Sequence, residues 1–392
     1  MKRSINSLIL LFLILVIYLA ANPVISTRKY AEPDRGNTVF PGEFDPQQAI
    51  WLMWPSDIYT YSSQPVEKTM AVIIETLARH IRVNLMVNSD LEIRRVKNRF
   101  QIDGFSGENV YFYKVLHQTI WARDVGPTFI NSNGQLQVVN FAFNNFGRQA
   151  DPDYIRSESL VDVRSADLFE LPVLNTGLVS EGGGIESNGR GTIITTEAVA
   201  LKRNPGLTKE QIEQEYQRAL GIKKVIWLSK GLAEEDGITG GHVDEMVRFV
   251  DPHTILLAQV LPEDRNSNDI SRASYEHLEE NYRTLCNASD QDGQPFRIIR
   301  LPMPPTLYRE LDHLNDIPVR SYLNFAISDG IILMPVYWKT GRSAALQASD
   351  QQVRAVLQGI FPGREVVGID VESINHWGGG IHCVTQHMPL IP

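Results

Sequence analysis

The stretch Ser321–Tyr337, with the sequence SYLNFAISDGIILMPVY, decides the fold that this chain is predicted to adopt. Its two apolar runs flank Ser-Asp-Gly at 328–330, a pattern typical of a β-hairpin because Asp-Gly readily forms tight turns. A helix candidate follows over 350–361, where apolar side chains form one stripe and Pro-Gly at 362–363 ends the helix. Because 365–370 is then a third strand candidate, the unit is strand, strand, helix, strand.

The same order of elements recurs upstream at a spacing of roughly 60 residues, which is typical of repeat architectures. The copies are strands 246–250 and 254–260 with helix 271–286 and strand 296–301; hairpin 184–196 with a helix from 208 and strand 223–228; hairpin 127–143; and strand 49–54 with a helix across 70–81 and strand 83–87. Paired strands favour a ring over an open α/β sheet, whose strands alternate singly with helices. We therefore predict an α/β fold of about five modules arranged as a propeller-like ring.

Capping and turn signals in two of the copies support the positions of their predicted helix and hairpin. Thr208 and Gln211 have the spacing of a capping box at a helix start, and Gly221 is suited to end that helix. Asn133-Gly134 predicts the turn of another hairpin.

Each copy begins with a residue that can take part in chemistry. These residues are Asp124, Glu181, His242, Asn324 and Cys383. Since equivalent positions of modules in a ring converge on its axis, we expect the five side chains to share a central site.

Cys383 is one of two cysteines in 392 residues and lies in a short apolar segment after the glycines at 378–380. Glycines let the backbone approach a ligand closely, so the thiol is a candidate nucleophile. A thiol must lose its proton before it can attack. If the segment is extended, His382 points away from the sulfur. The base is therefore expected to come from elsewhere in the chain.

The segment 239–250 offers that base. If it is a strand, His242 and Asp244 project to one side, which places an imidazole and a carboxylate on one face. Asp124 lies close in sequence to Trp121, so a carboxylate and a flat aromatic ring are expected near each other. Simpler interpretations remain open: an ordinary ion pair for His-x-Asp, a core position for the tryptophan, and, for Glu181, acceptance from backbone donors in its glycine loop.

The remaining histidines and the second cysteine have simpler interpretations. His376, His382 and His387 are expected to be structural or exposed, because their spacings match no standard zinc-ligand pattern. Cys286 falls at helical spacing with apolar residues of 271–286 and is predicted to be an inert core residue. A disulfide between the two cysteines is the alternative in an oxidising compartment.

Residues 1–26 are typical of a targeting segment, with Lys2 and Arg3 before an uncharged run and a small-residue site ending at Ser26. Cleavage after Ser26, or alternatively after Ala21, would release the rest of the chain as a soluble protein. The alternative is an uncleaved anchor over residues 5–26, since the uncharged run is long enough to span a bilayer. Either outcome predicts an exported protein, secreted or periplasmic in the first case and membrane-anchored in the second.

The rest of the chain is predicted to be a linker over 27–40 and a single domain over 41–392. Without the two basic residues of the leader, 35 basic residues face 46 acidic ones, a net charge of −11. Such a balance argues against nucleic acid as a partner and suits a small cationic substrate. The apolar content of 43% is ample for a large core. The sequence leaves oligomerisation open.

The motifs resemble those of the agmatine deiminase and bacterial-type (Porphyromonas-type) peptidylarginine deiminase family, in family order over about residues 40–392. The matching stretches are Pro41–Pro55, Trp121–Phe129, Glu181–Ile185, Gly241–Asp244, Ser321–Phe325 and Gly380–Gln386. The resemblance implies the fivefold pseudosymmetric α/β propeller of the guanidine-modifying (pentein) superfamily. It also implies a hydrolase that deiminates a guanidinium group without a metal or other cofactor.

The resemblance also implies roles for individual residues. Cys383 matches the nucleophile and His242 the general acid and base. Asp124 and Asp244 match two carboxylates that hold the guanidinium. A guanidinium is planar, always charged and rich in N–H donors, so paired carboxylates can bind it while its carbon faces a thiolate. Three further positions match residues that bind or line the substrate: Trp121, Glu181 and Asn324.

Departures from the family pattern concern the substrate. Phe146 and Arg148 replace a tryptophan and a glycine that are typical of agmatine deiminases, and Glu186 replaces a histidine. Arginines of the peptidylarginine branch bind a substrate carboxylate in this region, a role open to Arg148. We predict deimination of agmatine to N-carbamoylputrescine and ammonia. The alternatives are deimination of peptidyl or free arginine to citrulline, and a guanidinium-binding protein without turnover.

Overall fold

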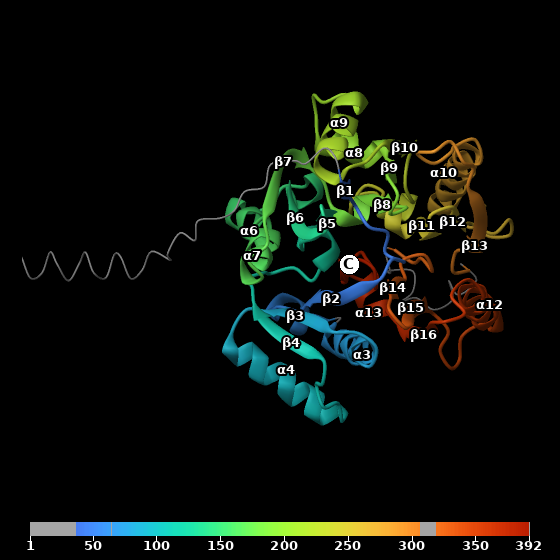
Figure 1. Ribbon diagram of the computed structural model, residues 1–392. Helices are drawn as coiled ribbons and strands as arrows, with labels where there is room; N and C mark the ends of the chain where they lie inside the picture. Colours follow the sequence, from blue (N-terminus) through green and yellow to red (C-terminus); the bar gives the residue numbers. More distant parts are fainter. Residues whose placement is uncertain (1–36, 64, 306–318, 392) are drawn as a thin grey trace, which may run out of the picture.

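The computed structural model describes residues 37–63, 65–305 and 319–391, so the predicted leader lies outside the described residues. Within them the strands form five separate sheets. Figure 1 shows the sheets around a common centre, with the longer helices toward the outside. No helix in the described ranges is both long and apolar enough to cross a membrane.

Four of the sheets share one order, in which a hairpin is followed, after a helical segment, by a strand parallel to the hairpin's second strand. Their strands are β5 (Thr128–Ser132), β6 (Gln135–Ala142) and β7 (Val173–Val179); β8 (Ile185–Ser187), β9 (Thr192–Thr196) and β10 (Lys224–Leu228); β11 (Val247–Asp251), β12 (Thr254–Gln259) and β13 (Arg297–Pro302); β14 (Ala326–Ser328), β15 (Ile331–Val336) and β16 (Glu365–Asp370). The predicted repeat of strand, strand, helix, strand is therefore present. β1 (Thr38–Val39), within the predicted linker, pairs with β5.

The fifth sheet joins the two ends of the described chain. β17 (Gln386–Pro389) pairs antiparallel with β2 (Gln47–Met53), to which β3 (Val83–Val87) and β4 (Val110–Lys114) add in parallel. The strand that follows Cys383 thus takes the first hairpin position of this sheet, and the N-terminal strand takes the second. This pairing places β17 beside β2, near the centre of the molecule where the C-terminus is marked in Figure 1.

The helices follow the sequence signals. They are α2 (Asp57–Thr60), α3 (Glu67–Ala78), α4 (Asp90–Asp103), α5 (Ala122–Val125), α6 (Pro152–Glu158), α7 (Val161–Leu168), α8 (Glu197–Arg203), α9 (Lys209–Leu220), α10 (Asp269–Cys286), α12 (Ala344–Ile360) and α13 (Glu372–Asn375), with the 3-10 turns η1 (Asn145–Gly147), η2 (Gly182–Gly184), η3 (Ala233–Glu235) and η4 (Val243–Glu245). α9 confirms its predicted ends, because Thr208 and Gln211 form the capping box and Gly221 closes the helix with φ at 70°.

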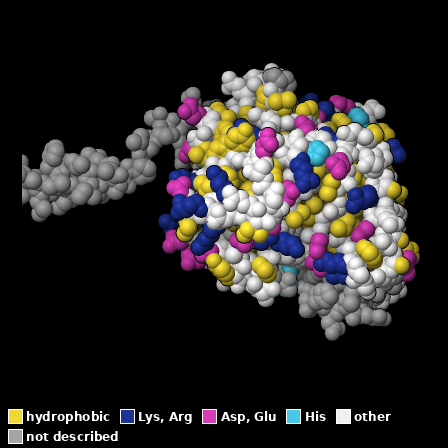
Figure 2. Space-filling view, turned by 90° about the horizontal axis from the view of Figure 1, so that it is seen from below, with side chains coloured by type: hydrophobic (Ala, Val, Ile, Leu, Met, Phe, Trp, Pro, Cys, Tyr) yellow, Lys and Arg dark blue, Asp and Glu magenta, His cyan; other side chains and the backbone are white. Residues whose placement is uncertain are grey.

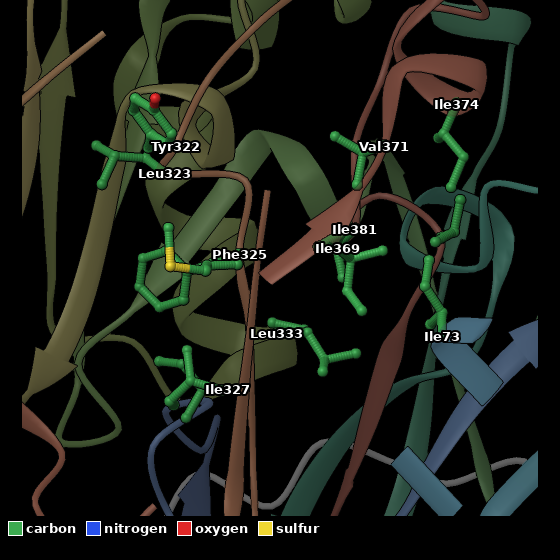
Figure 3. Close-up of a cluster of buried hydrophobic side chains, with 14 of the residues drawn as sticks. Ile73, Tyr322, Leu323, Phe325, Ile327, Leu333, Ile369, Val371, Ile374 and Ile381 are labelled. Atoms are coloured by element: carbon green, nitrogen blue, oxygen red, sulfur yellow. The ribbon is translucent and has the colours of Figure 1, made fainter. Parts of the chain in front are cut away.

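Apolar side chains anchor the segments that carry the polar centre. Figure 3 shows side chains around the β14–β16 sheet packed with others from α3, α13 and the C-terminal turn. Leu323 and Phe325, on either side of Asn324, are almost fully buried. Ile381 and Val384 are buried on either side of His382-Cys383. Since burying a Leu or Phe side chain contributes about 1.5–3 kcal/mol, these anchors fix the position of the intervening polar residues.

The prediction for Cys286 is wrong. It is the last residue of α10 and is exposed, and the preceding Leu285 fills the core instead. Both cysteines are free thiols, so the alternative of a disulfide between Cys286 and Cys383 is not realised.

Candidate active site

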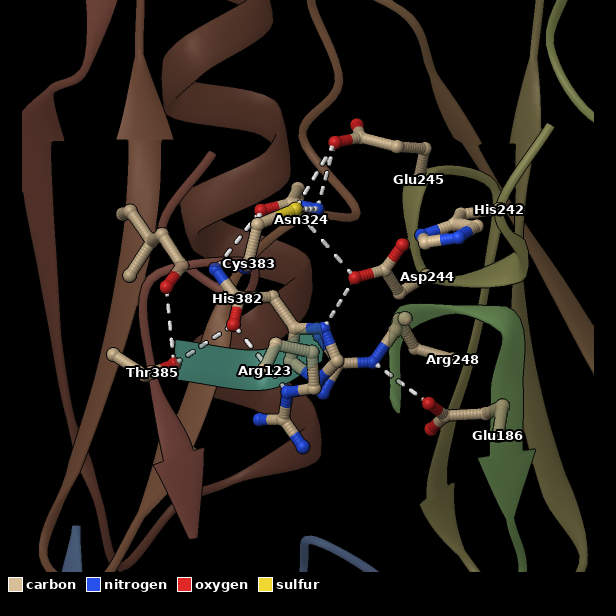
Figure 4. Close-up of polar contacts among 12 residues, drawn as sticks. Arg123, Glu186, His242, Asp244, Glu245, Arg248, Asn324, His382, Cys383 and Thr385 are labelled. Carbon is tan, nitrogen blue, oxygen red and sulfur yellow. Dashed lines mark hydrogen bonds and ion pairs between the residues drawn. The ribbon is translucent and has the colours of Figure 1, made fainter. Parts of the chain in front are cut away.

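The five residues at the module starts lie just before the first strand of each sheet, and the contacts described below connect them at the centre. Asp124 belongs to α5 before β5, and Glu181 precedes η2 and β8. His242 is the N-cap of η4 before β11, Asn324 precedes β14, and Cys383 precedes β17. Figure 4 shows His242, Asn324 and Cys383 converging from different sheets.

The sulfur of Cys383 is surrounded by polar side chains. Asn324 Nδ2 donates to Sγ at 3.1 Å, and Sγ lies 3.7 Å from both Asp244 Oδ2 and Glu245 Oε1. Burial, followed by the charges of the nearby acids, raises the pKa of the Cys383 thiol well above its usual range. The thiol is therefore protonated in the free protein, and a bound cation would be needed to favour the thiolate.

The Cys383 segment is a turn, whereas the sequence argument assumed an extended strand. The amide of Val384 donates to the carbonyl of Gly380 at 3.4 Å, and that of Thr385 donates to the carbonyl of His382 at 3.1 Å. A side chain at Gly380 would meet Asn324 Oδ1 at 2.5 Å, so only glycine allows this approach. The direction of His382 therefore cannot be derived from strand alternation.

His242 is fully buried and held by two carboxylates. Its Nε2 lies 3.3 Å from Glu181 Oε2, and its Nδ1 lies 3.8 Å from Asp124 Oδ1. Burial lowers the pKa of His242, but the hydrogen bond to Glu181 and the charges of the surrounding acids raise it more, to about 9. The imidazole is therefore protonated at neutral pH. The condition that His242 and Asp244 lie on a strand is not met, since η4 forms there and β11 begins at Val247, close to the start of the predicted strand 246–250.

Glu181 connects His242 to a buried arginine. Arg203 Nε donates to Glu181 Oε1 at 2.7 Å, while Oε2 faces the imidazole. Although burial raises the pKa of Glu181, the hydrogen bond and charge of His242 and the guanidinium of Arg203 lower it below its usual value. Both oxygens thus contact side chains, in contrast to the simpler interpretation that Glu181 accepts from its glycine loop.

Gly183 marks the point where three of the predicted site residues meet. A Cβ there would lie 2.6 Å from His242 Nδ1 and 3.0 Å from both Asp124 Oδ1 and Asp244 Oδ2. Its own amide donates to Asp124 Oδ1 at 3.0 Å. Burial raises the pKa of Asp124 to about 6, opposed by His242 and assisted by the charges of Asp244 and Glu181. Asp124, Asp244 and His242 therefore share one compact centre.

A second buried histidine, His382, contacts the carboxylate of Asp244. Asp244 Oδ2 lies 2.6 Å from His382 Nδ1, and His382 Nε2 lies 2.7 Å from Glu43 Oε2. Burial raises the pKa of Asp244, but the hydrogen bond and charge of His382 lower it more, with help from His242 and Arg248. Of the two expectations for His382, structural or exposed, the exposed one is wrong, because the side chain is buried and contacts a predicted site residue.

Glu43 and Arg248 were missed by sequence reasoning. Arg123 Nη2 and Arg248 Nη2 lie 3.1 Å and 3.0 Å from Glu43 Oε2, and the amide of Ile327 donates to Oε1 at 2.7 Å. These contacts join segments from four sheets through one buried carboxylate. The available signal was the position of Glu43 in the N-terminal motif Pro41–Pro55.

The aromatic and arginine residues noted in the sequence lie near this centre. Trp121 is partly exposed, and a Cβ on Gly379 would meet both its ring and the Cys383 side chain. Phe146 has its ring centroid 5.9 Å from that of His242, and the exposed Arg148 guanidinium lies 5.2 Å above the Phe146 ring.

The other residues singled out in the sequence lie elsewhere. Glu186 is buried; it accepts from the amide of Phe249 at 2.9 Å and lies 3.3 Å from Arg248 Nε. His376 is exposed. His387 is buried, and burial together with Arg123 lowers its pKa to about 3.

One group among the described residues has side chains of metal-ligand type, namely Asp244, Glu245 and Cys383. The carboxylate oxygens that face the sulfur are already engaged, one by His382 and the other by Asn324. The group also lacks the imidazole or second thiolate of common zinc sites. The group therefore does not match the ligand set of a common zinc site.

A family model described as Porphyromonas-type peptidyl-arginine deiminase matches residues 39–389. The chain belongs to this family. An agmatine deiminase of Medicago truncatula is 30% identical over 381 residues, which cover 90% of this chain and 96% of that relative. The family is thus one of hydrolases that act on carbon–nitrogen bonds of amidines.

Solved structures of the same family share the α/β fold. An agmatine deiminase of Enterococcus faecalis superposes with a TM-score of 0.79 at 24% identity, covering 94% of this chain and all 100% of that one. A Porphyromonas gingivalis protein assigned as an arginine deiminase superposes with a TM-score of 0.74 at 30% identity, covering 90% and 98%. The α/β class predicted from the sequence is confirmed.

Proposed function

We propose that this protein hydrolyses agmatine to N-carbamoylputrescine and ammonia, with Cys383 as nucleophile. The observation that carries the proposal is the meeting of His242, Asp124 and Asp244 at Gly183, with Asp244 also 3.7 Å from the Cys383 sulfur. Agmatine deiminases among the relatives support the choice of substrate.

Binding of the substrate brings a positive charge into a site that has an excess of acidic groups around Cys383. Asp124 and Asp244 can accept from the N–H groups of a guanidinium, whose fixed planar donors suit two carboxylates. The bound cation opposes the acids that raise the pKa of Cys383, so the thiol loses its proton to solvent as the substrate binds. The guanidinium carbon then faces a thiolate.

The first half of the reaction forms a carbon–sulfur bond. Thiolate attack on the guanidinium carbon gives a tetrahedral adduct, and the His242 imidazolium donates its proton to a terminal nitrogen. The carbon–nitrogen bond breaks and ammonia leaves, so an amidino thioether on Cys383 and a neutral His242 remain. The high pKa of His242 fits this first role as an acid.

The second half consumes one water molecule. Neutral His242 takes a proton from water, the oxygen attacks the amidino carbon, and the carbon–sulfur bond breaks. The ureido product leaves after giving one proton to solvent, Cys383 remains in the site as a thiolate, and His242 is again protonated. One water is consumed and one ammonia is formed, which balances the hydrolysis.

Deimination of peptidyl or free arginine is the second candidate. Arg148 favours it, because its exposed guanidinium stacks on Phe146, which in turn contacts the His242 ring. A cation at this distance from the centre could bind a substrate carboxylate, which agmatine lacks. The partner is thus a small guanidinium substrate or an arginine-containing peptide.

We also propose an architecture and a location for the domain. The order shared by four sheets, with β17 and β2 in the hairpin positions of the fifth, supports a fivefold pseudosymmetric propeller forming one domain from about residue 41 onward. The charge pattern of the leader supports an exported protein, with the leader cleaved or retained as an anchor. On the face seen in Figure 2, basic and acidic side chains are interspersed, in keeping with a small-molecule substrate rather than nucleic acid.

The function is tested by incubating the purified protein separately with agmatine, with arginine and with a peptide ending in arginine. Ureido product and ammonia are measured for each. We expect equal amounts of both products from agmatine, and none with Cys383→Ala. Preferred turnover of arginine or of the peptide would replace the first candidate with the second. Turnover of none would favour a binding protein.

A further inference from the structure

Glu245 is a buried acidic residue for which the proposed reaction has no role. It follows Asp244 in η4, and its side chain is almost completely removed from solvent. Its Oε1 accepts from Asn324 Nδ2 at 2.8 Å and lies 3.7 Å from Cys383 Sγ (Figure 4). Its Oε2 has no hydrogen-bond partner among the described residues.

The amide of Asn324 has a fixed orientation. Its Oδ1 accepts from the backbone N–H of His382 at 2.9 Å and of Cys383 at 3.4 Å. Its Nδ2 therefore faces the other way and carries two N–H donors. One partner of Nδ2 is Glu245 Oε1, and the other is the sulfur at 3.1 Å. Each donor thus has its own acceptor.

We propose that Glu245 is a positioning residue for the nucleophile, whose carboxyl accepts one N–H of Asn324 so that the other points at Cys383 Sγ. Without that acceptor the amide can tilt, and the donor to sulfur is weakened. A donor directed at sulfur favours the thiolate over the thiol, so this contact assists nucleophile formation. The inference rests on the proposed use of Cys383 as nucleophile and is independent of which guanidinium compound is the substrate.

The surroundings of Glu245 indicate that it acts as a neutral carboxyl. Burial first, and then the charges of Asp244 and Glu235, raise the pKa of Glu245 well above its usual value. None of the ion pairs among the described side chains joins it to a cation. A neutral carboxyl still accepts through its carbonyl oxygen, and it avoids a second negative charge close to the thiolate.

The rate at which iodoacetamide alkylates Cys383 tests this role without requiring turnover. Cys286 is first replaced by alanine, so that Cys383 is the remaining thiol. Glu245→Gln keeps a carbonyl acceptor at the same place, whereas Glu245→Leu removes it. Glu234→Leu is the matched control, because this neighbouring acid accepts from Ser274 and contacts neither Asn324 nor the sulfur.

The alkylation rate is measured against pH. Glu245→Gln and Glu234→Leu should stay within about threefold of the parent. Glu245→Leu should be slowed on the order of tenfold, as expected when a hydrogen bond to a charged atom is lost. Asn324→Ala should be slowed similarly, and Glu245→Leu should add nothing in that background. A purely structural role would not produce this dependence on Asn324.

Two results would overturn the proposal. One is an unchanged alkylation rate in Glu245→Leu, shown by its thermal melt to be folded; Glu245→Met replaces it if the leucine variant does not fold. The other is alkylation about tenfold faster in Glu245→Gln, which would mean that Glu245 is ionised and opposes the thiolate. Absence of agmatine turnover with the expected alkylation pattern would refute the proposed substrate alone.

Discussion

His382 Nδ1 and Asp244 Oδ2 lie 2.6 Å apart, and the same Asp244 oxygen lies 3.7 Å from the sulfur of Cys383. The histidine next to the proposed nucleophile in sequence therefore contacts a carboxylate rather than the thiol. Its other nitrogen is fixed by Glu43, so the imidazole is held at both ends. We infer that this arrangement keeps Asp244 ionised and oriented toward the guanidinium.

Replacing His382 by glutamine should raise the pKa of Asp244, because its largest lowering contribution comes from His382. The acid side of the pH profile of kcat/KM should therefore move to higher pH, and kcat/KM near neutral pH should fall by about tenfold or more. His376→Gln, at an exposed histidine, is the matched control and should leave the profile unchanged. An unshifted profile in His382→Gln would refute the inferred role.

Alanine at Gly183 should disable the site. The added Cβ would meet His242 Nδ1 at 2.6 Å and Asp124 and Asp244 at 3.0 Å, so these side chains must move apart. We expect activity to fall by about 100-fold, since misplacement of about 1 Å costs that much, and stability to fall by about 1–3 kcal/mol. Steady-state kinetics and urea unfolding measure the two effects. A Cβ added at Gly177 meets no atom within 4 Å, so Gly177→Ala should lower neither activity nor stability.

The raised pKa of His242 predicts a dependence of stability on pH. Because the folded pKa is about 9 against 6.5 in the unfolded chain, the contribution is complete below pH 6.5 and is lost as pH rises through 9. The difference in unfolding free energy between wild type and His242→Gln should therefore shrink by about 3 kcal/mol between pH 6 and pH 9.5. Urea titrations at both pH values measure it. A constant difference would show that His242 is not protonated in the folded protein.

Arg148 should separate the two substrate classes. Agmatine has no carboxylate, so Arg148→Gln should change its kcat/KM by less than about threefold, as expected for an exposed side chain. Any turnover of arginine or of an arginine peptide should fall by about tenfold, the usual effect of losing a charge-assisted hydrogen bond. Equal loss with both substrates would show that Arg148 acts through Phe146 instead.

Treatment with a chelator should leave activity within about twofold of the untreated protein, because each proposed step uses a thiol, an imidazole and carboxylates. Activity before and after EDTA, with and without added zinc, measures this. Loss on chelation and recovery with zinc would contradict the thiol mechanism.

Local sequence signals predicted most of the elements. The hairpin at 326–336, the strand at 365–370 and the capped helix from Thr208 depend on neighbouring residues, which is why turn and capping signals located them. The pairing of β17 with β2 was not predicted, since it joins residues more than 330 positions apart. No local pattern records that pairing, although it completes the fifth sheet.

Some residues of the candidate site were predicted from the sequence and others were missed. Module order alone brought Cys383, His242 and Asp124 together, because repetition places equivalent positions at one centre. The extended conformation assumed for His382 and Cys383 was wrong, because the three glycines permit a turn there. Glu43 was missed because one glutamate in a loop has no periodic or spacing signal. Its importance depends on the buried cations that surround it.

The most direct test of the account is to identify a covalent intermediate on Cys383. The protein is quenched with acid during turnover of agmatine, digested, and its peptides are weighed by mass spectrometry. The account predicts that the peptide containing Cys383 gains the mass of agmatine less ammonia, and that Cys383→Ala gives neither adduct nor product. Product formation by Cys383→Ala would contradict it.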